Sequence, residues 1–271
     1  MMVRFFVWLF GKLPNLRRKL AHYSYERLAS RLHNREWTFM NYGFVPAAGA
    51  ALELAPEDEA DRLSIQLYHR AVSPVDLRGK RVLEVGSGRG GGASFLARYH
   101  HAAHVTGADF SAHAVALARS FHAAVDNLEF TEGDAENLPF PDARFDVVVN
   151  VESSHCYGQM DKFLSEVFRV LRPGGYFLYT DFRAPTDIAS LERMLDGQSG
   201  WQRVAHEDIT GAVVAALEAG DAEKRKLIKR LVRRRGARKP AGEFAGLVGS
   251  RMYEIFRKRE MIYFRYVYQR R

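Results

Sequence analysis

The chain has a single cysteine, Cys156, among its 271 residues. One cysteine cannot form an intrachain disulfide, and a cysteine-rich metal site cannot be built from it. Proteins of oxidising compartments commonly contain paired cysteines, so a single cysteine is typical of a protein in a reducing compartment. We therefore expect a cytoplasmic protein.

Long hydrophobic runs are also missing. The strongest apolar stretch, residues 5–10, is far shorter than the roughly 20 residues that a membrane span requires. Gly11, Lys12 and Pro14 interrupt it, and no small-residue cleavage site lies in the right place, so we expect neither a spanning helix nor a secretory signal. A terminal helix packed on the domain is the favoured interpretation, with a lid or a membrane-surface contact as alternatives.

Positive charge is plentiful but uneven. The formal net charge is +8, and ten Lys or Arg residues fall between Lys224 and Lys239. Apolar residues recur within this stretch at helical spacing, which predicts an amphipathic basic helix over residues 221–235: Leu227, Ile228, Leu231 and Val232. A solvated face without a partner is one interpretation. Contact with a membrane surface or an acidic carrier protein is the other, and the membrane is favoured if the substrate is a lipid.

Strand-like and helix-like segments alternate through the middle of the chain, which predicts a doubly wound α/β fold with a mostly parallel sheet. The predicted strands are 81–85, 104–108, 128–131, 145–151 and 176–180, followed by 201–206 and 261–268. An apolar content of 47% is enough for one substantial core. We expect a helical N-terminal wall over residues 1–70 and the α/β domain over 71–271. A helical cap insertion is expected over about 207–258, with Asp208 and Asp221 capping successive helices.

A glycine-rich turn, Gly86-Ser87-Gly88-Arg89-Gly90-Gly91-Gly92, follows the first predicted strand. Glycines allow a tight turn and a close approach of a ligand to the backbone N–H groups. Taken alone the turn is ambiguous, because Gly86, Gly88 and Gly91 also fit the dinucleotide-binding pattern G-x-G-x-x-G.

Three acidic residues favour S-adenosylmethionine over a dinucleotide. Glu84 suits the ammonium group of that cofactor and would repel a pyrophosphate. Asp109 closes the second strand, where a carboxylate can accept both ribose hydroxyls, and its alternative role is a helix cap before Ser111. Asp134 follows the third strand, from which it can accept a hydrogen bond from the adenine amino group.

Four ordered motifs resemble those of the class I S-adenosylmethionine-dependent methyltransferases: Glu84-Val85-Gly86-Ser87-Gly88, Asp109-Phe110-Ser111, residues 133–140 (GDAENLPF) and residues 171–175 (LRPGG). Residues 67–70 (LYHR), 90–94 (GGGAS) and 150–157 (NVESSHCY) resemble, more narrowly, the phthiotriol/phenolphthiotriol dimycocerosate and fatty-acid O-methyltransferases. The narrower resemblance covers about residues 68–183.

This resemblance implies a seven-stranded sheet whose last strand is antiparallel, with the cofactor across the carboxyl ends of the first, second and fourth strands. Tyr42 is expected to close over the methionine moiety, or else to pack in the core. The implied cofactor-binding residues are Tyr42, Glu84, Gly86, Ser87, Gly88, Asp109, Phe110, Asp134, Ala135, Asn150 and Val151.

Methyl transfer is an in-line displacement, so the enzyme must align the reactants and, for a hydroxyl acceptor, remove a proton. His155 follows the fourth strand, and an ordinary histidine pKa of roughly 6.5 suits a general base. Asp181 ends the fifth strand and is expected to orient His155 or to contact the acceptor. We expect Glu152 and Tyr157 to contact the substrate. The predicted function is O-methylation of a small hydrophobic acceptor, such as a lipid or polyketide.

Several alternatives stay open. Carbon methylation uses the same fold and cofactor. A nucleic-acid methyltransferase is disfavoured because Glu152-Ser153-Ser154-His155 stands where amino-methylating enzymes of this kind carry Asn/Asp-Pro-Pro-Tyr/Phe. A nicotinamide oxidoreductase would leave Glu84 and Asp134 unexplained, and a catalytically silent cofactor-binding protein is the non-enzyme alternative. We expect no metal, because the histidines between residues 100 and 122 lack a partner at metal-ligand spacing.

Overall fold

A computed structural model describes residues 37–47, 52–232 and 234–271. Seven strands form its sheet: β1 (Arg81–Val85), β2 (His104–Asp109), β3 (Leu128–Glu132), β4 (Phe145–Val151), β5 (Leu171–Arg183), β6 (Trp201–Asp208) and β7 (Ile262–Arg270). Their order is β3-β2-β1-β4-β5-β7-β6. Strand β7 pairs antiparallel with β5 and β6, whereas the other pairs are parallel. The predicted seven-stranded α/β fold is confirmed, including its antiparallel last strand.

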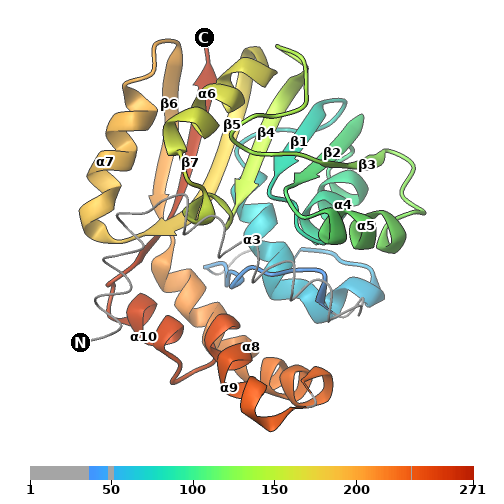
Figure 1. The fold of residues 1–271 in the computed structure, drawn as a ribbon, viewed down its shortest axis with the longest axis vertical. Helices are drawn as coiled ribbons and strands as arrows, with labels where there is room; N and C mark the ends of the chain where they lie inside the picture. The colour runs from blue at the N-terminus through green and yellow to red at the C-terminus, as the bar shows by residue number, and fades with distance from the viewer. Residues whose placement is uncertain (1–36, 48–51, 233) are drawn as a thin grey trace.

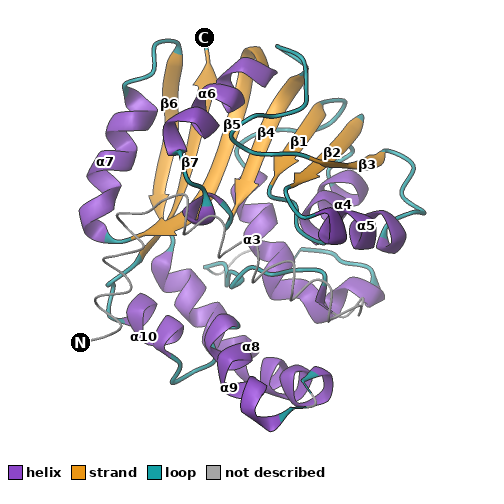
Figure 2. Ribbon diagram, viewed as in Figure 1, coloured by secondary structure: helices purple, strands orange, loops and turns teal. Residues whose placement is uncertain are grey.

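Helices cover both faces of the sheet (Figure 2). One face packs against α3 (Arg62–Val72), α4 (Gly91–Tyr99) and α5 (Ala112–Phe121), and the other against α6 (Met160–Val170) and α7 (Pro185–Asp196). Alternate residues of a buried strand therefore belong to different halves of the core: Val82 joins the α3 side and Leu83 the α6 side. Short 3-10 helices precede α3 and follow β4, namely η2 (Pro56–Asp61) and η3 (Ser154–Cys156).

Three helices lie between β6 and β7 in the sequence. They are α8 (Thr210–Leu231), α9 (Arg235–Phe244) and α10 (Arg251–Arg257). Figure 1 shows them grouped beyond the end of the sheet at which the parallel strands finish. They therefore stand at the edge where α/β folds place their ligands.

The structure corrects the predicted helix boundaries in this insertion. Asp221 does not cap a second helix, because α8 runs unbroken for 22 residues. The Asp221 carboxylate instead accepts a hydrogen bond from Val248 N–H at 2.8 Å and pairs with Arg225 at 2.6 Å. Gly220 lies inside α8, and a Cβ there would stand 3.2 Å from Leu63 Cδ1 of α3, so the glycine allows α8 to pack closely on α3. The predicted basic helix over 221–235 is likewise wrong, since α8 ends at Leu231 and α9 begins at Arg235.

Much of the predicted N-terminal wall, including the apolar run at residues 5–10, lies outside the described residues. The predicted boundary at residue 70, between the N-terminal wall and the α/β domain, stays a prediction. Within the described ranges, no helix is long and apolar enough to cross a membrane.

Candidate active site

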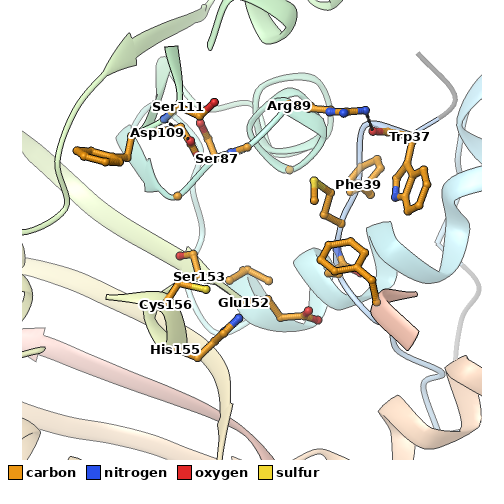
Figure 3. A pocket seen from close by; sticks show the side chains of 18 of the residues that line it. Trp37, Phe39, Ser87, Arg89, Asp109, Ser111, Glu152, Ser153, His155 and Cys156 are labelled. Atoms are coloured by element: carbon orange, nitrogen blue, oxygen red, sulfur yellow. Dashed lines mark hydrogen bonds between the residues drawn. The ribbon is translucent and has the colours of Figure 1, made fainter. Parts of the chain in front are cut away.

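A cavity of about 790 Å³ lies at the carboxyl edge of the sheet, in the size range of small-molecule sites. It surrounds the point between β1 and β4 where the strand order reverses. Figure 3 shows side chains converging on it from the glycine loop, from the loop after β4 and from the segment that begins at Trp37. Most of the predicted site residues line it: Tyr42, Gly86, Ser87, Gly88, Asp109, Phe110, Asp134, Ala135, Val151, Glu152, His155 and Tyr157.

The glycine loop is fixed to β2 by backbone bonds. Gly86 and Ser87 donate N–H bonds to Ala108 O at 2.7 and 3.0 Å. Gly86 has a φ of +77°, and a Cβ there would stand 2.3 Å from Ser153 Oγ. Only glycine fits this position, because both the backbone conformation and the space exclude a side chain.

Asp109 stands opposite this loop at the end of β2. One carboxylate oxygen accepts Gly88 N–H at 2.8 Å and the other accepts Ser111 N–H at 2.9 Å. Ser111 itself caps α5 by accepting Ala114 N–H. The carboxylate therefore holds two cavity loops together as well as lining the cavity. Ser111 and not Asp109 caps α5, and the ribose contact of Asp109 stays a prediction.

The cavity fits the nucleoside end of S-adenosylmethionine. Ser87 Oγ is buried and makes no hydrogen bond within the described part of the chain, as expected of a hydroxyl that binds a ligand. Phe110 is 44% exposed although it lines the cavity, so its ring offers an apolar surface to a flat group such as adenine. When bound, the cofactor supplies an activated methyl group on sulfonium sulfur.

Glu84 and Asn150 stand behind the cavity wall rather than in it. Strand alternation turns Glu84 toward α3, where its carboxylate accepts the Tyr68 hydroxyl at 2.6 Å and is fully buried. Burial raises the pKa of Glu84 to about 7. Asn150 donates to Val85 O at 2.9 Å and to Ser153 Oγ at 2.7 Å. These two residues therefore support the wall. Glu84 does not line the cavity, and its predicted contact with the cofactor stays a prediction.

His155 and Asp181, which are 26 residues apart in the sequence, are brought together. His155 Nδ1 lies 2.9 Å from Asp181 Oδ1, and the imidazole stacks on Phe182 at 4.5 Å. The ring lines the cavity, whereas Asp181 is fully buried behind it. Nδ1 is directed to the carboxylate, and the His155 side chain also makes a hydrogen bond with Cys156.

Sequence reasoning missed two partners of Asp181. Ser154 Oγ donates to Asp181 Oδ2 at 2.5 Å, and the Arg183 guanidinium lies 3.3 Å from the same oxygen. Burial opposes ionisation of Asp181, but Arg183 and His155 outweigh it and hold the pKa of this carboxyl well below its ordinary value. Burial also opposes protonation of His155, but Cys156 and Asp181 outweigh it and raise the His155 pKa well above the ordinary value.

Glu152 and Tyr157 differ in what they contact. Glu152 accepts Tyr42 N–H at 2.7 Å and the Tyr263 hydroxyl. The Tyr157 hydroxyl lies 2.9 Å from Ser153 Oγ, and a Cβ at Gly86 would stand 3.1 Å from it. Tyr157 therefore borders the glycine loop, on the side of the cavity expected to hold the cofactor.

Apolar side chains from the end of α8 and from α9 form a roof that sequence reasoning did not assign to the site. They are Leu231, Val232, Ala237, Pro240, Ala241 and Phe244. The spacing of Ala237, Ala241 and Phe244, one face of a helix, is a signal that could have found this roof. Trp37, Phe39 and Met40 line the adjoining wall. Among the described residues, no cluster of three metal-ligating side chains occurs.

Known proteins match the chain closely. A family model described as "Methyltransferase domain" matches residues 83–179. A fatty-acid O-methyltransferase of Mycolicibacterium smegmatis is 47% identical over 194 residues, which cover 72% of this chain and 70% of the relative. The phthiotriol/phenolphthiotriol dimycocerosates methyltransferase of Mycobacterium tuberculosis is 38% identical over 251 residues, covering 93% and 92%.

Solved structures share the fold. A putative sarcosine dimethylglycine methyltransferase from Galdieria sulphuraria aligns with a TM-score of 0.68 at 17% identity, covering 91% of this chain and 98% of that one. A geranyl diphosphate C-methyltransferase from Streptomyces coelicolor, in complex with S-adenosyl-L-homocysteine, aligns with a TM-score of 0.64 at 17% identity and the same coverages. The identity to the curated relatives over most of the chain, together with the site geometry, shows that this enzyme belongs to the S-adenosylmethionine-dependent methyltransferases, in the group of the fatty-acid and phthiotriol dimycocerosates methyltransferases.

Proposed function

We propose that the enzyme methylates an oxygen of a lipid-like hydrophobic acceptor. The observation that carries this proposal is the make-up of the cavity, which is lined both by His155 and by an apolar roof that includes Leu231 and Phe244. An amphiphilic molecule fits such a space because its polar end can reach His155 while its apolar part contacts the roof. The names of the curated relatives, a fatty-acid and a phthiotriol methyltransferase, support this class of acceptor.

For a hydroxyl acceptor, we propose that His155 removes the proton and that Asp181 orients the ring. The Nδ1 contact at 2.9 Å fixes the ring, and the buried carboxylate stabilises the imidazolium that forms. Because the His155 pKa is raised, the neutral ring that acts as a base dominates only on the alkaline side.

A carboxylate acceptor is the second candidate, and the raised His155 pKa favours it specifically. A carboxylate needs no base, because it is already ionised at neutral pH. The protonated imidazole would donate a hydrogen bond to it and hold it in place. The relative named as a fatty-acid O-methyltransferase agrees with this chemistry.

Transfer of radiolabelled methyl groups from S-adenosylmethionine to a long-chain alcohol and to the matching fatty acid tests both candidates. His155→Ala should lower kcat for the alcohol by about 10²- to 10⁴-fold, the usual contribution of a general base. With the fatty acid, the same substitution should mainly raise KM. If His155→Ala keeps nearly full activity on both, the residue has neither role. If the wild type methylates neither acceptor, carbon methylation of an acceptor that needs no base is favoured instead.

We also propose that the rim of the cavity contacts an anionic lipid surface. Lys229, Arg234, Arg235 and Lys239 are exposed on the last turn of α8 and on α9, and Arg234 also lines the cavity. Exposed cations attract anionic headgroups by roughly 1 kcal/mol each near a membrane surface. Phe244, 44% exposed on the same rim, adds an apolar contact. This surface would let a lipid acceptor pass directly from the membrane into the cavity.

A further inference from the structure

Glu152 combines a strained backbone with a fixed carboxylate. Its φ is +46°, a conformation that a residue with a side chain rarely adopts. Its N–H nevertheless donates to Thr180 O at 2.9 Å, so the strained peptide is held to β5 at the end of β4. Strained residues of this kind persist where the surrounding structure fixes them, and they cluster at functional sites.

The two carboxylate oxygens of Glu152 have different surroundings. Oε1 accepts both Tyr42 N–H and the hydroxyl of Tyr263, which lies on β7. Oε2 accepts no hydrogen bond from the described residues. It is also not fully enclosed by protein atoms, so a ligand can reach it. Since Glu152 lines the cavity, Oε2 is the oxygen that remains for a ligand.

The charges around Glu152 do not neutralise it directly. Lys224 of α8 is within electrostatic reach, but its ammonium donates to Ala245 O at 3.3 Å. His155 lies 2.9 Å from the fully buried Asp181, so any positive charge on its ring is paired with that carboxylate. Asp109 and Asp134, the other acids considered above, accept backbone N–H groups: Asp109 from Gly88 and Ser111, and Asp134 from Glu136. Glu152 is therefore a carboxylate on the His155 side of the cavity whose charge is available to a bound cation.

We propose that Glu152 recognises the sulfonium charge of S-adenosylmethionine, a different charge of the same cofactor from the ammonium group that the sequence pattern assigned to Glu84. The inference rests on the use of this cofactor and not on the identity of the acceptor. The sulfonium charge disappears when the methyl group leaves, so a fixed carboxylate favours the cofactor over the product. Glu152 then helps the enzyme to bind S-adenosylmethionine and to release S-adenosylhomocysteine.

Isothermal titration of the wild type and of Glu152→Gln tests this inference, at a pH well above the Glu152 pKa of about 7. The probes are S-adenosylmethionine, sinefungin, in which an amine keeps the positive charge, and neutral-sulfur S-adenosylhomocysteine. Glu152→Gln should weaken the two charged ligands by about tenfold more than the product, a modest share of the attraction between charges a few ångströms apart. The amide keeps an oxygen for Tyr42 N–H, so the loop contact is preserved.

Tyr263→Phe is the matched control, because it removes one bond to Oε1 but leaves the charge. This variant should keep the preference for charged ligands. In the wild type, the same preference should fall as the pH is lowered through about 7, because the protonated carboxyl loses its charge. The inference is overturned if Glu152→Gln weakens all three ligands equally, which would mean that Glu152 only positions Tyr42, or if it weakens none.

Discussion

Gly86 is the residue whose replacement most directly tests the cofactor loop. Gly86→Ala places a Cβ 2.3 Å from Ser153 Oγ and forces a side chain into a left-handed conformation that costs about 1–2 kcal/mol. We expect binding of S-adenosylhomocysteine, measured by titration calorimetry, to fall below detection.

Gly174 provides the matched control for this change. Its φ of +79° is nearly the same as that of Gly86, but no atom lies within 4 Å of an added Cβ. Gly174→Ala should therefore lower stability by the backbone strain alone and leave the affinity unchanged. If Gly86→Ala and Gly174→Ala lose affinity equally, then backbone strain, and not the contact of the new Cβ with Ser153, limits cofactor binding.

The His155 and Asp181 pair predicts the pH dependence of the reaction. The folded-state pKa of His155 is raised, so its proton is lost only as the pH rises above the ordinary histidine range. With a hydroxyl acceptor, kcat should increase with pH up to that raised pKa and then level off. With a carboxylate acceptor, activity should instead decline over the same interval, because the protonated ring is lost.

Removing the Asp181 charge should move this pH profile. Asp181→Asn takes away the negative charge that supports the imidazolium, so the titration of His155 in the kcat profile should shift to lower pH. Ser154→Ala is the control, since it removes one bond to Asp181 but keeps both the charge and the Nδ1 contact. A profile that is identical in wild type and Asp181→Asn would mean that another group titrates.

At the scale of elements, the break between α8 and α9 decides what the basic segment can do. Arg238 donates to Val232 O at 3.0 Å and to Lys229 O at 3.2 Å, so it satisfies carbonyls at the end of α8 and does not act as a free cation. The turn directs Leu231 and Val232 into the cavity. The segment is thus divided between a roof for the acceptor and an outward cationic rim.

Charge reversal on this rim tests the proposed lipid surface. The double variant Lys229→Glu and Arg235→Glu should largely abolish sedimentation with liposomes that contain anionic lipid, because each cation contributes roughly 1 kcal/mol. Reversal of Lys162, exposed on α6 away from the rim, should have little effect. If the double variant sediments like the wild type, the rim does not bind the membrane. If the double variant still sediments with the liposomes but no longer binds an acidic carrier protein, that protein is the partner of the rim.

At the scale of the whole molecule, the strand order places the site. The chain reverses direction across the sheet between β1 and β4, so the loops that follow these strands diverge and leave a crevice at their carboxyl ends. The end of α8, helix α9 and the segment from Trp37 then enclose that crevice. A single sheet thereby supplies the cofactor loop, the His155 and Asp181 pair and the attachment of the roof.

The sequence by itself determined the sheet and most of the cavity wall. Strand periodicity is local, and glycines such as Gly86 are required by backbone geometry, so both can be read without a structure. What only the tertiary structure decided is which side chains face the ligand and which charges meet. Glu84 is turned behind the wall by the alternation of β1 against α3, and Arg183 helps to lower the pKa of Asp181. Such electrostatic and packing effects depend on distances between segments far apart in the chain, and a sequence pattern does not contain them.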